Sequence, residues 1–284
     1  MADLQPMEFG QILDGALSMY RRHFGLFCKL SLAVMWLPIA LAVYWKLRFF
    51  GLQASSMEQV ALMQNELAAF ALWGLAFGIL YGLGVLLLTA GSIRVISDSY
   101  LGRPPQFRDA LGLGFAKIGP LFLVWLGKTL LLALLIVVCI LVVTLSILIT
   151  KSSGALAVLV GFIEVVAAIW GLIHVATGYM VTSPVVVLES LASSFDAFGR
   201  SWELMRGARG RLFGLMFVAG LISNALPSLV MTALGQLLLE LMPAALLPWT
   251  VLSVAVPILL APIITCILTL GYYDLRVRRE GFDL

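Results

Sequence analysis

The sequence predicts an all-α, polytopic membrane protein with six transmembrane helices and three amphipathic helices at the cytoplasmic surface. Three observations lead to this fold class: an excess of apolar residues, six apolar runs of spanning length, and an uneven distribution of positive charge. Hydrophobic residues make up 62% of the 284 residues and charged residues 12%, whereas soluble domains carry about 45–50% and about 25%. We therefore treat residues 1–284 as a single membrane domain.

Six apolar runs are long enough to cross a bilayer, which takes about 20 residues of helix. We place the spans at 24–45, 70–93, 119–149, 154–181, 212–239 and 245–273. The third and fourth runs are longer than needed, so tilt or an interfacial first turn is expected, and the TKSSG segment at 150–154 joins them as a tight hairpin. Prolines 38, 227, 257 and 262 predict kinks in their spans.

The positive charge predicts the direction of the spans. An even number of spans places both termini on one side, and most of the 18 lysines and arginines fall on that side. Lys46, Arg48 and Lys151 fall on the other side, and Lys128 lies within a span. Short loops with excess Lys and Arg stay in the cytoplasm, so both termini are expected there.

The cytoplasmic segments have helical periodicity of their own. Apolar residues recur at helical spacing, with polar residues opposite, in MEFGQILDGALSMYRRHFG, QFRDALGLGFAKIGPLF and LASSFDAFGRSWELMRGARGRLFG. Each segment has an aspartate early and basic residues late, as suits the helix dipole. One interpretation is a threefold repeat of an amphipathic helix plus a hairpin, with units 7–100, 105–185 and 189–284. The other is that any cytoplasmic segment leading into a span has this pattern.

Basic and aromatic residues near the ends of the spans predict a surface for anionic lipid headgroups or for a membrane-protein partner. A basic residue near such a membrane surface contributes about 1 kcal/mol. We assign to this surface Arg21, Arg22, Arg200, Trp202, Arg206, Arg209, Arg211, Arg276, Arg278 and Arg279. Tyr272 and Tyr273 are expected at the headgroup level.

Polar side chains inside the spans are candidate functional residues because ionisable groups at membrane depth are costly. They are Lys128, Glu164, His174 and Asn224. The rise per residue places Lys128 and His174 at a similar level and Glu164 deeper. Lys128 could also extend its amine to the interface, and Glu164 and His174 could serve as structural hydrogen-bonding groups instead of a proton relay.

Gly74, Gly78 and Gly82 repeat every four residues and lie on one face of the second span. Small residues at this spacing allow the backbones of two membrane helices to approach closely. The spacing predicts a helix contact, within the chain or between chains, and we favour the contact within the chain.

Several function classes lack their usual sequence signals. The basic residues are dispersed between apolar runs, so no nucleic-acid partner is expected. Cys28, Cys139 and Cys266 are far apart in apolar surroundings, which favours packing thiols over a metal site. The loops contain no glycine-rich phosphate loop, H-E-x-x-H motif or nucleophile elbow. We expect no cofactor, no metal and no enzymatic activity.

Four stretches, ILDGALSMYRRHFG, VISDSYLGRPP, RSWELMRG and especially YYDLRVRREGFDL, resemble the bacterial glycerophosphoryl diester phosphodiesterase membrane-domain family. The similarity covers nearly the whole chain. It implies a bacterial inner-membrane protein. The resemblance also implies that, in the phosphodiesterases of this family, the membrane module accompanies a soluble barrel that holds catalytic histidines and metal-binding carboxylates. We expect this barrel to be missing here, since no stretch is long enough to form it.

The sequence therefore predicts a non-enzymatic accessory or scaffold module that packs with a membrane partner, binds anionic phospholipid, or both. The alternative prediction is a small-solute or ion transporter or channel with a path through the bundle axis. That path would use Lys128, Glu164 and His174.

Overall fold

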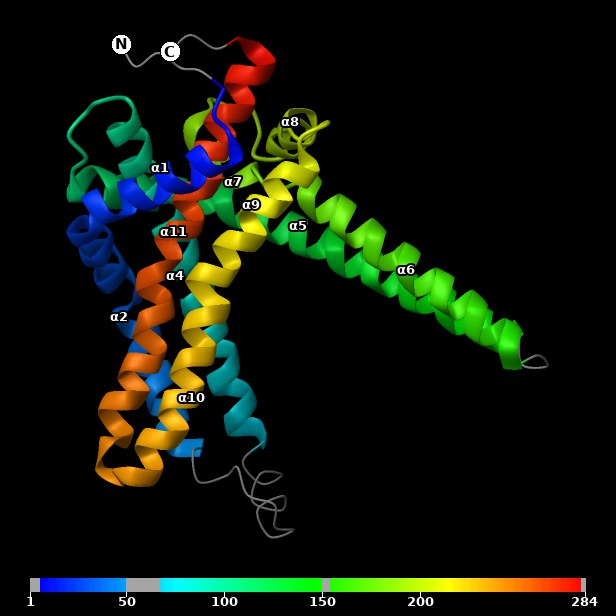
Figure 1. Cartoon of the computed structure of the whole chain (residues 1–284), viewed down its shortest axis with the longest axis horizontal. Helices are drawn as coiled ribbons and strands as arrows, with labels where there is room; N and C mark the ends of the chain where they lie inside the picture. Colours follow the sequence, from blue (N-terminus) through cyan, green and yellow to red (C-terminus); the bar gives the residue numbers. More distant parts are fainter. Residues whose placement is uncertain (1–5, 50–66, 150–153, 282–284) are drawn as a thin grey trace. The chain divides into compact units, whose positions relative to one another are not determined.

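The computed structural model describes residues 6–49, 67–149 and 154–281, and all regular elements in these ranges are helical. In chain order they are α1 (Phe9–Arg22), α2 (Phe24–Phe49), α4 (Leu67–Tyr100), α5 (Phe107–Ile149), α6 (Gly154–Gly178), α7 (Thr182–Leu188), α8 (Asp196–Leu204), α9 (Arg209–Gly220), the π-helix η2 (Leu221–Ala225), α10 (Leu226–Leu241), the 3₁₀-helix η3 (Pro243–Ala245) and α11 (Leu246–Glu280) (Figure 1).

Six helical stretches are long and apolar enough to cross a membrane, which confirms the predicted all-α polytopic fold. They are Phe24–Leu47, Ala71–Tyr100, Phe107–Leu148, Val158–Leu188, Arg209–Leu241 and Leu246–Glu280. The predicted hairpin turn at 150–154 falls almost entirely outside the described residues. The short helix α7 was not predicted as a separate element.

The second predicted amphipathic helix is continuous with its span. Residues 107–118 form the first turns of α5, which runs for 43 residues without a break. A helix commonly ends at a residue with left-handed backbone, and among the described residues this occurs at Gly102, Gly207 and Gly281, none of them inside α5. The glycines of α5 remain helical, so nothing ends the helix before the span.

The contacts divide the chain into two compact units. One consists mainly of Met7–Ile118 and Gly214–Gly271, and the other mainly of Gly119–Phe213 and Tyr272–Leu284. A core of the first unit is formed by Leu30, Met35, Leu88 and Ile258. We describe each unit by itself.

In the first unit, α1 is the amphipathic helix that the periodicity predicts. It buries Ile12, Ala16 and Tyr20 and crosses α11 (Figure 1). The Tyr20 hydroxyl donates a hydrogen bond of 2.9 Å to the carbonyl of Leu259, and its ring stacks on Phe27 at 5.7 Å. Burial raises the pKa of Tyr20 to about 12, so the hydroxyl stays protonated and remains a donor.

Two glycines of α4 allow its close approach to α2, but they are not the predicted ones. A Cβ at Gly84 would lie 2.8 Å from the sulfur of Met35, and a Cβ at Gly91 would lie 2.8 Å from a methyl of Leu30. A Cβ at Gly74, Gly78 or Gly82 would meet nothing within 4 Å. The contact that we favoured for these three glycines is therefore absent from the described part of the chain, and a contact between chains stays a prediction.

Replacing Gly91 by alanine is expected to destabilise the full chain by about 1–3 kcal/mol, because the new methyl group overpacks the α2–α4 interface. The neighbouring carbonyl of Ala110 lies 3.2 Å from the same Cβ position and belongs to the backbone, so it cannot easily move away. Thermal unfolding in detergent micelles measures the effect. The matched control is Gly78→Ala in the same helix, which should be neutral or slightly stabilising; an equal loss in both variants would contradict the assignment.

The fifth span contains a π-helical turn at its middle. Pro227, the second residue after η2, has no N–H to donate to the carbonyl of Ser223, so the regular hydrogen-bond ladder cannot continue there. Asn224, predicted as an intramembrane polar candidate, lies in this turn with an exposed side chain. The proline explains the local change of helix type without any ligand.

Candidate functional site

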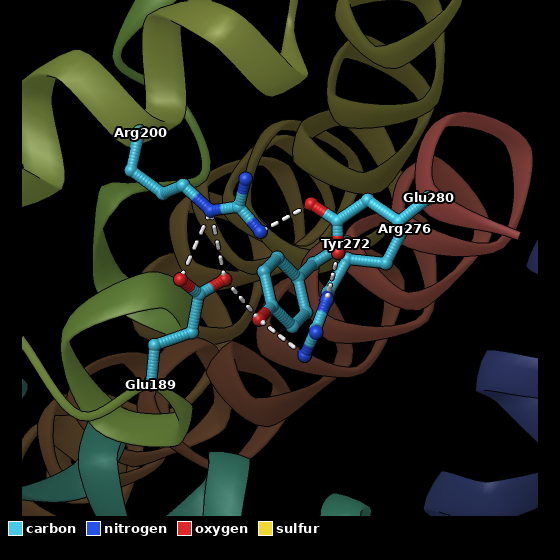
Figure 2. A network of polar contacts seen from close by, with 5 residues as sticks. All are labelled: Glu189, Arg200, Tyr272, Arg276 and Glu280. Atoms are coloured by element: carbon cyan, nitrogen blue, oxygen red, sulfur yellow. Dashed lines mark hydrogen bonds and ion pairs between the residues drawn. The ribbon is translucent and has the colours of Figure 1, made fainter. Parts of the chain in front are cut away.

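The second unit contains a connected set of charged groups that joins α11 to the segment around α8 (Figure 2). Glu189 accepts hydrogen bonds from Nε of Arg200 at 3.0 Å and from the hydroxyl of Tyr272 at 2.7 Å. The hydroxyl of Tyr272 also accepts from Arg276 at 3.3 Å. Glu280 pairs with Arg276 at 2.9 Å and with Arg200. We call these five residues the tail network.

The tail network is balanced in charge and partly buried. Two guanidinium groups face two carboxylates, and the side chain of Glu189 is 15% exposed. Burial alone would lower the pKa of Arg200, but hydrogen bonds and charge attraction from Glu189 and Glu280 outweigh it and raise the pKa. A site with no spare charge is suited to hold α11 in place and unsuited to attract a ligand.

A second ionic group lies one turn away on α11. Asp274 is 3% exposed and accepts from Nε of Arg278 at 3.0 Å and from Nη1 of Arg211 at 3.1 Å. Arg279 donates to the backbone carbonyl of Arg206. Gly207 follows in the turn between α8 and α9. Its φ of 71° lies in the left-handed region, where a residue with a side chain would be strained.

These contacts show that part of the predicted lipid-headgroup or partner surface is paired within the chain. Four of its arginines face carboxylates of the chain, namely Arg200, Arg211, Arg276 and Arg278. Tyr272, expected at the headgroup level, is fully buried, and Tyr273 is 5% exposed. Much of the closing motif that looked like a lipid anchor therefore acts within the protein.

Several predicted surface cations keep an exposed side chain without a carboxylate partner. Arg21, Arg22, Arg206 and Arg279 are exposed, and within the described ranges none of them has an acidic partner. Nε2 of His23, the residue after Arg22, lies 2.9 Å from the hydroxyl oxygen of Ser99. Burial and the neighbouring Arg22 lower the pKa of His23, so at neutral pH the positive charge here comes from Arg21 and Arg22.

Arg209 and His174, predicted separately, meet in one cluster. The Arg209 guanidinium lies 4.0 Å from the centroid of the Trp202 ring, and its Nη1 contacts Nε2 of His174. The His174 ring stacks on Trp170 at 5.1 Å and meets the edge of Trp202 at 5.7 Å. We call these four residues the Arg209 cluster. Nε of Arg209 is buried and has no hydrogen-bond partner in the described part of the chain.

An open cavity of about 150 Å³ lies beside the cluster. Its lining combines apolar residues with a few polar ones. The lining residues are Trp170, Ile173, His174, Thr177, Arg209, Gly210 and Phe213. Gly178 is necessary for this arrangement, because a Cβ there would overlap the ring of Trp202. The hydroxyl of Ser201 donates to the carbonyl of Gly178 at 2.9 Å and fixes α8 against the end of α6.

The other intramembrane candidates are not brought together. Lys128 is partly buried, and Glu164 has one buried carboxylate oxygen without a hydrogen-bond partner in the ranges described. The described contacts include no bond from either residue to His174 or Asn224. The structure therefore does not assemble the predicted polar set into one site.

Neither metal ligation nor a known relative adds to this site. No group of three or more His, Cys, Asp or Glu residues suited to a metal occurs among the residues that the structure describes. Comparisons with family models, with curated proteins and with solved structures find no match. This region places a cation–aromatic cluster next to an apolar cavity, an arrangement suited to binding.

Proposed function

We propose that this chain is a non-enzymatic, multi-pass protein of the bacterial inner membrane that binds anionic phospholipid at the cytoplasmic leaflet and serves there as an accessory or scaffold module. Both termini face the cytoplasm in this proposal, because most of the lysines and arginines lie on their side of the spans. The resemblance of the closing motif to a membrane-domain family supports a role as a membrane module.

The observation that carries the proposal is the division of the arginines into two groups. One group is neutralised by carboxylates of the chain, as Arg200 and Arg276 are in the tail network. The other, including Arg21 and Arg22 next to the exposed ring of Phe24, has no acidic partner among the described residues. Cations beside an aromatic ring at the start of a span attract anionic headgroups.

Neutralising this second group should reduce lipid selectivity. We expect the wild-type protein, extracted with its surrounding lipid, to be enriched in anionic phospholipid over the bulk membrane. The double variant Arg21→Gln/Arg22→Gln should lower this enrichment by roughly twofold or more, since each basic residue contributes about 1 kcal/mol near the surface. Mass spectrometry of the co-purified lipids measures the change.

The matched control for this experiment is Lys46→Gln/Arg48→Gln, which removes two positive charges at the opposite end of the first span and should leave the enrichment unchanged. A reporter fused after residue 284 checks the orientation. Absence of any enrichment in the wild-type protein would refute lipid binding. Solute flux through reconstituted vesicles that depends on Lys128, Glu164 or His174 would instead favour the alternative, a transporter.

A further inference from the structure

The Arg209 cluster contains a positive charge that the described residues do not neutralise. The group nearest to its guanidinium is an imidazole, and no carboxylate faces it in the part of the chain that the structure describes. The Arg209 side chain is partly buried, and a charge that loses part of its hydration is costly unless it is paired. The contact with Trp202 at 4.0 Å offsets part of this cost but covers only one face of the guanidinium.

The hydrogen-bonding capacity of Arg209 is also incomplete. Its Nε–H is buried without an acceptor, whereas Nε of Arg200 and Arg278 is used for carboxylate pairs. A planar guanidinium with unused N–H groups matches two oxygens of one phosphate or carboxylate. Arg209 is also the first residue of α9, where backbone N–H groups lack acceptors within the helix and favour an anion.

The cavity indicates which kind of anion fits. Its volume of about 150 Å³ is much larger than the roughly 10–15 Å³ that a cavity must offer to hold one water molecule. Trp170, Ile173 and Phe213 line it, and all three are exposed and belong to candidate membrane spans. A free phosphate would leave these apolar surfaces uncovered, whereas a lipid would place its headgroup at the cation and an acyl chain along the rings.

We infer that the Arg209 cluster and the adjoining cavity bind the phosphate headgroup of a single anionic phospholipid, with one acyl chain along Trp170 and Phe213. Arg209 and the start of α9 hold the phosphate, and His174 and Trp202 hold the guanidinium in place. This inference rests on the proposed function and adds a defined site to it, separate from the exposed cations at Arg21 and Arg22.

Lipid-dependent thermal unfolding of the full chain in detergent tests the site. Phosphatidylglycerol should raise the Tm of the wild-type protein in a saturable way, because a ligand that binds the folded state stabilises it. Sodium phosphate and phosphatidylcholine at matched concentration should not. Arg209→Gln should weaken the apparent affinity for phosphatidylglycerol roughly tenfold or more. The matched control is Arg103→Gln, which removes the same charge from an exposed arginine that lies outside the cavity and outside the predicted lipid surface.

The outcomes separate the site from the proposed function. Equal affinities in Arg209→Gln and Arg103→Gln would overturn the site but leave lipid binding by other cations intact. Stabilisation by sodium phosphate as strong as that by phosphatidylglycerol would overturn the lipid assignment. If Arg209→Gln does not fold, Arg209→Lys retains the charge without the planar N–H pair. Its affinity should fall several-fold, and an unchanged affinity would overturn the inference.

Discussion

Replacement of Glu189 by alanine is expected to lower the free energy of unfolding of the full chain by about 2–4 kcal/mol. The substitution leaves the hydroxyl of Tyr272 without its acceptor and leaves Arg200 with Glu280 as its remaining carboxylate. Breaking a fully buried pair costs about 3–5 kcal/mol, and we reduce this value because the side chain of Arg200 is 26% exposed. Denaturant unfolding followed by circular dichroism in detergent micelles gives the measurement.

Two further variants test whether this loss of stability comes from the contacts of the tail network or from the removal of any carboxylate. Glu203→Ala removes an exposed carboxylate from α8 and should change stability by about 0.5 kcal/mol or less. Tyr272→Phe keeps the ring but removes the hydroxyl, and it should cost about 1–2 kcal/mol. If Glu189→Ala were no worse than Glu203→Ala, the tail network would have no role in holding α11.

The membrane class and the six spans could be predicted because they depend on composition and length alone. A bilayer accepts helices whose backbone groups bond internally and whose side chains are apolar over about 20 residues. Runs such as the one in α6 satisfy both conditions without reference to any other part of the chain. The amphipathic helix α1 was predictable for a similar reason, since its periodicity is local.

The role of the closing motif could be predicted only in part. Arg276–Glu280 and Asp274–Arg278 are pairs four residues apart on one helix, a spacing that can be read from the sequence. The partners Glu189 and Arg211 are far away in the sequence, so their contacts depend on the tertiary fold. The prediction of a lipid surface counted the arginines and omitted the acids that neutralise several of them.

The glycines of α4 show the same limit. Gly74, Gly78 and Gly82 have the familiar spacing, but Gly84 and Gly91, seven residues apart and so on one face, are the ones that α2 approaches. The deciding feature is the opposite surface, where Met35 and Leu30 project toward α4. A pattern of small residues shows where a close approach is possible, and the partner helix determines where it occurs.

The cluster around His174 was missed because its members come from three helices. Depth along the spans placed His174 near Lys128, a comparison that used α5 and α6 only. The segment that returns through α7 and α8 brings Trp202 to the end of α6, where Gly178 leaves room for its ring. The signal in the sequence is a tryptophan close to an arginine-rich turn. From the sequence alone, this pattern predicts a surface for lipid headgroups or for a partner.

Replacement of Asp274 by alanine is expected to have an effect at least as large as that of Glu189→Ala, a loss of about 2–4 kcal/mol. The carboxylate is 3% exposed and neutralises two guanidinium groups, those of Arg211 and Arg278. Both would lose this carboxylate, and we reduce the cost of about 3–5 kcal/mol for a fully buried pair because their side chains are 28% and 40% exposed. Denaturant unfolding of the full chain measures the loss, and Asp14→Ala, which removes an exposed carboxylate from α1, should be nearly neutral.

The cause of this loss can be tested by changing the partners of Asp274. Asp274→Asn keeps an oxygen that accepts a hydrogen bond but removes the charge, so its cost should lie between those of the wild type and the alanine variant. Adding Arg211→Gln to Asp274→Asn should restore part of the stability, because it removes one of the two cations that have lost the carboxylate of Asp274, and such coupling is expected for residues in contact. Additive losses in this pair would show that the 3.1 Å contact between Asp274 and Arg211 contributes nothing to the stability of the fold.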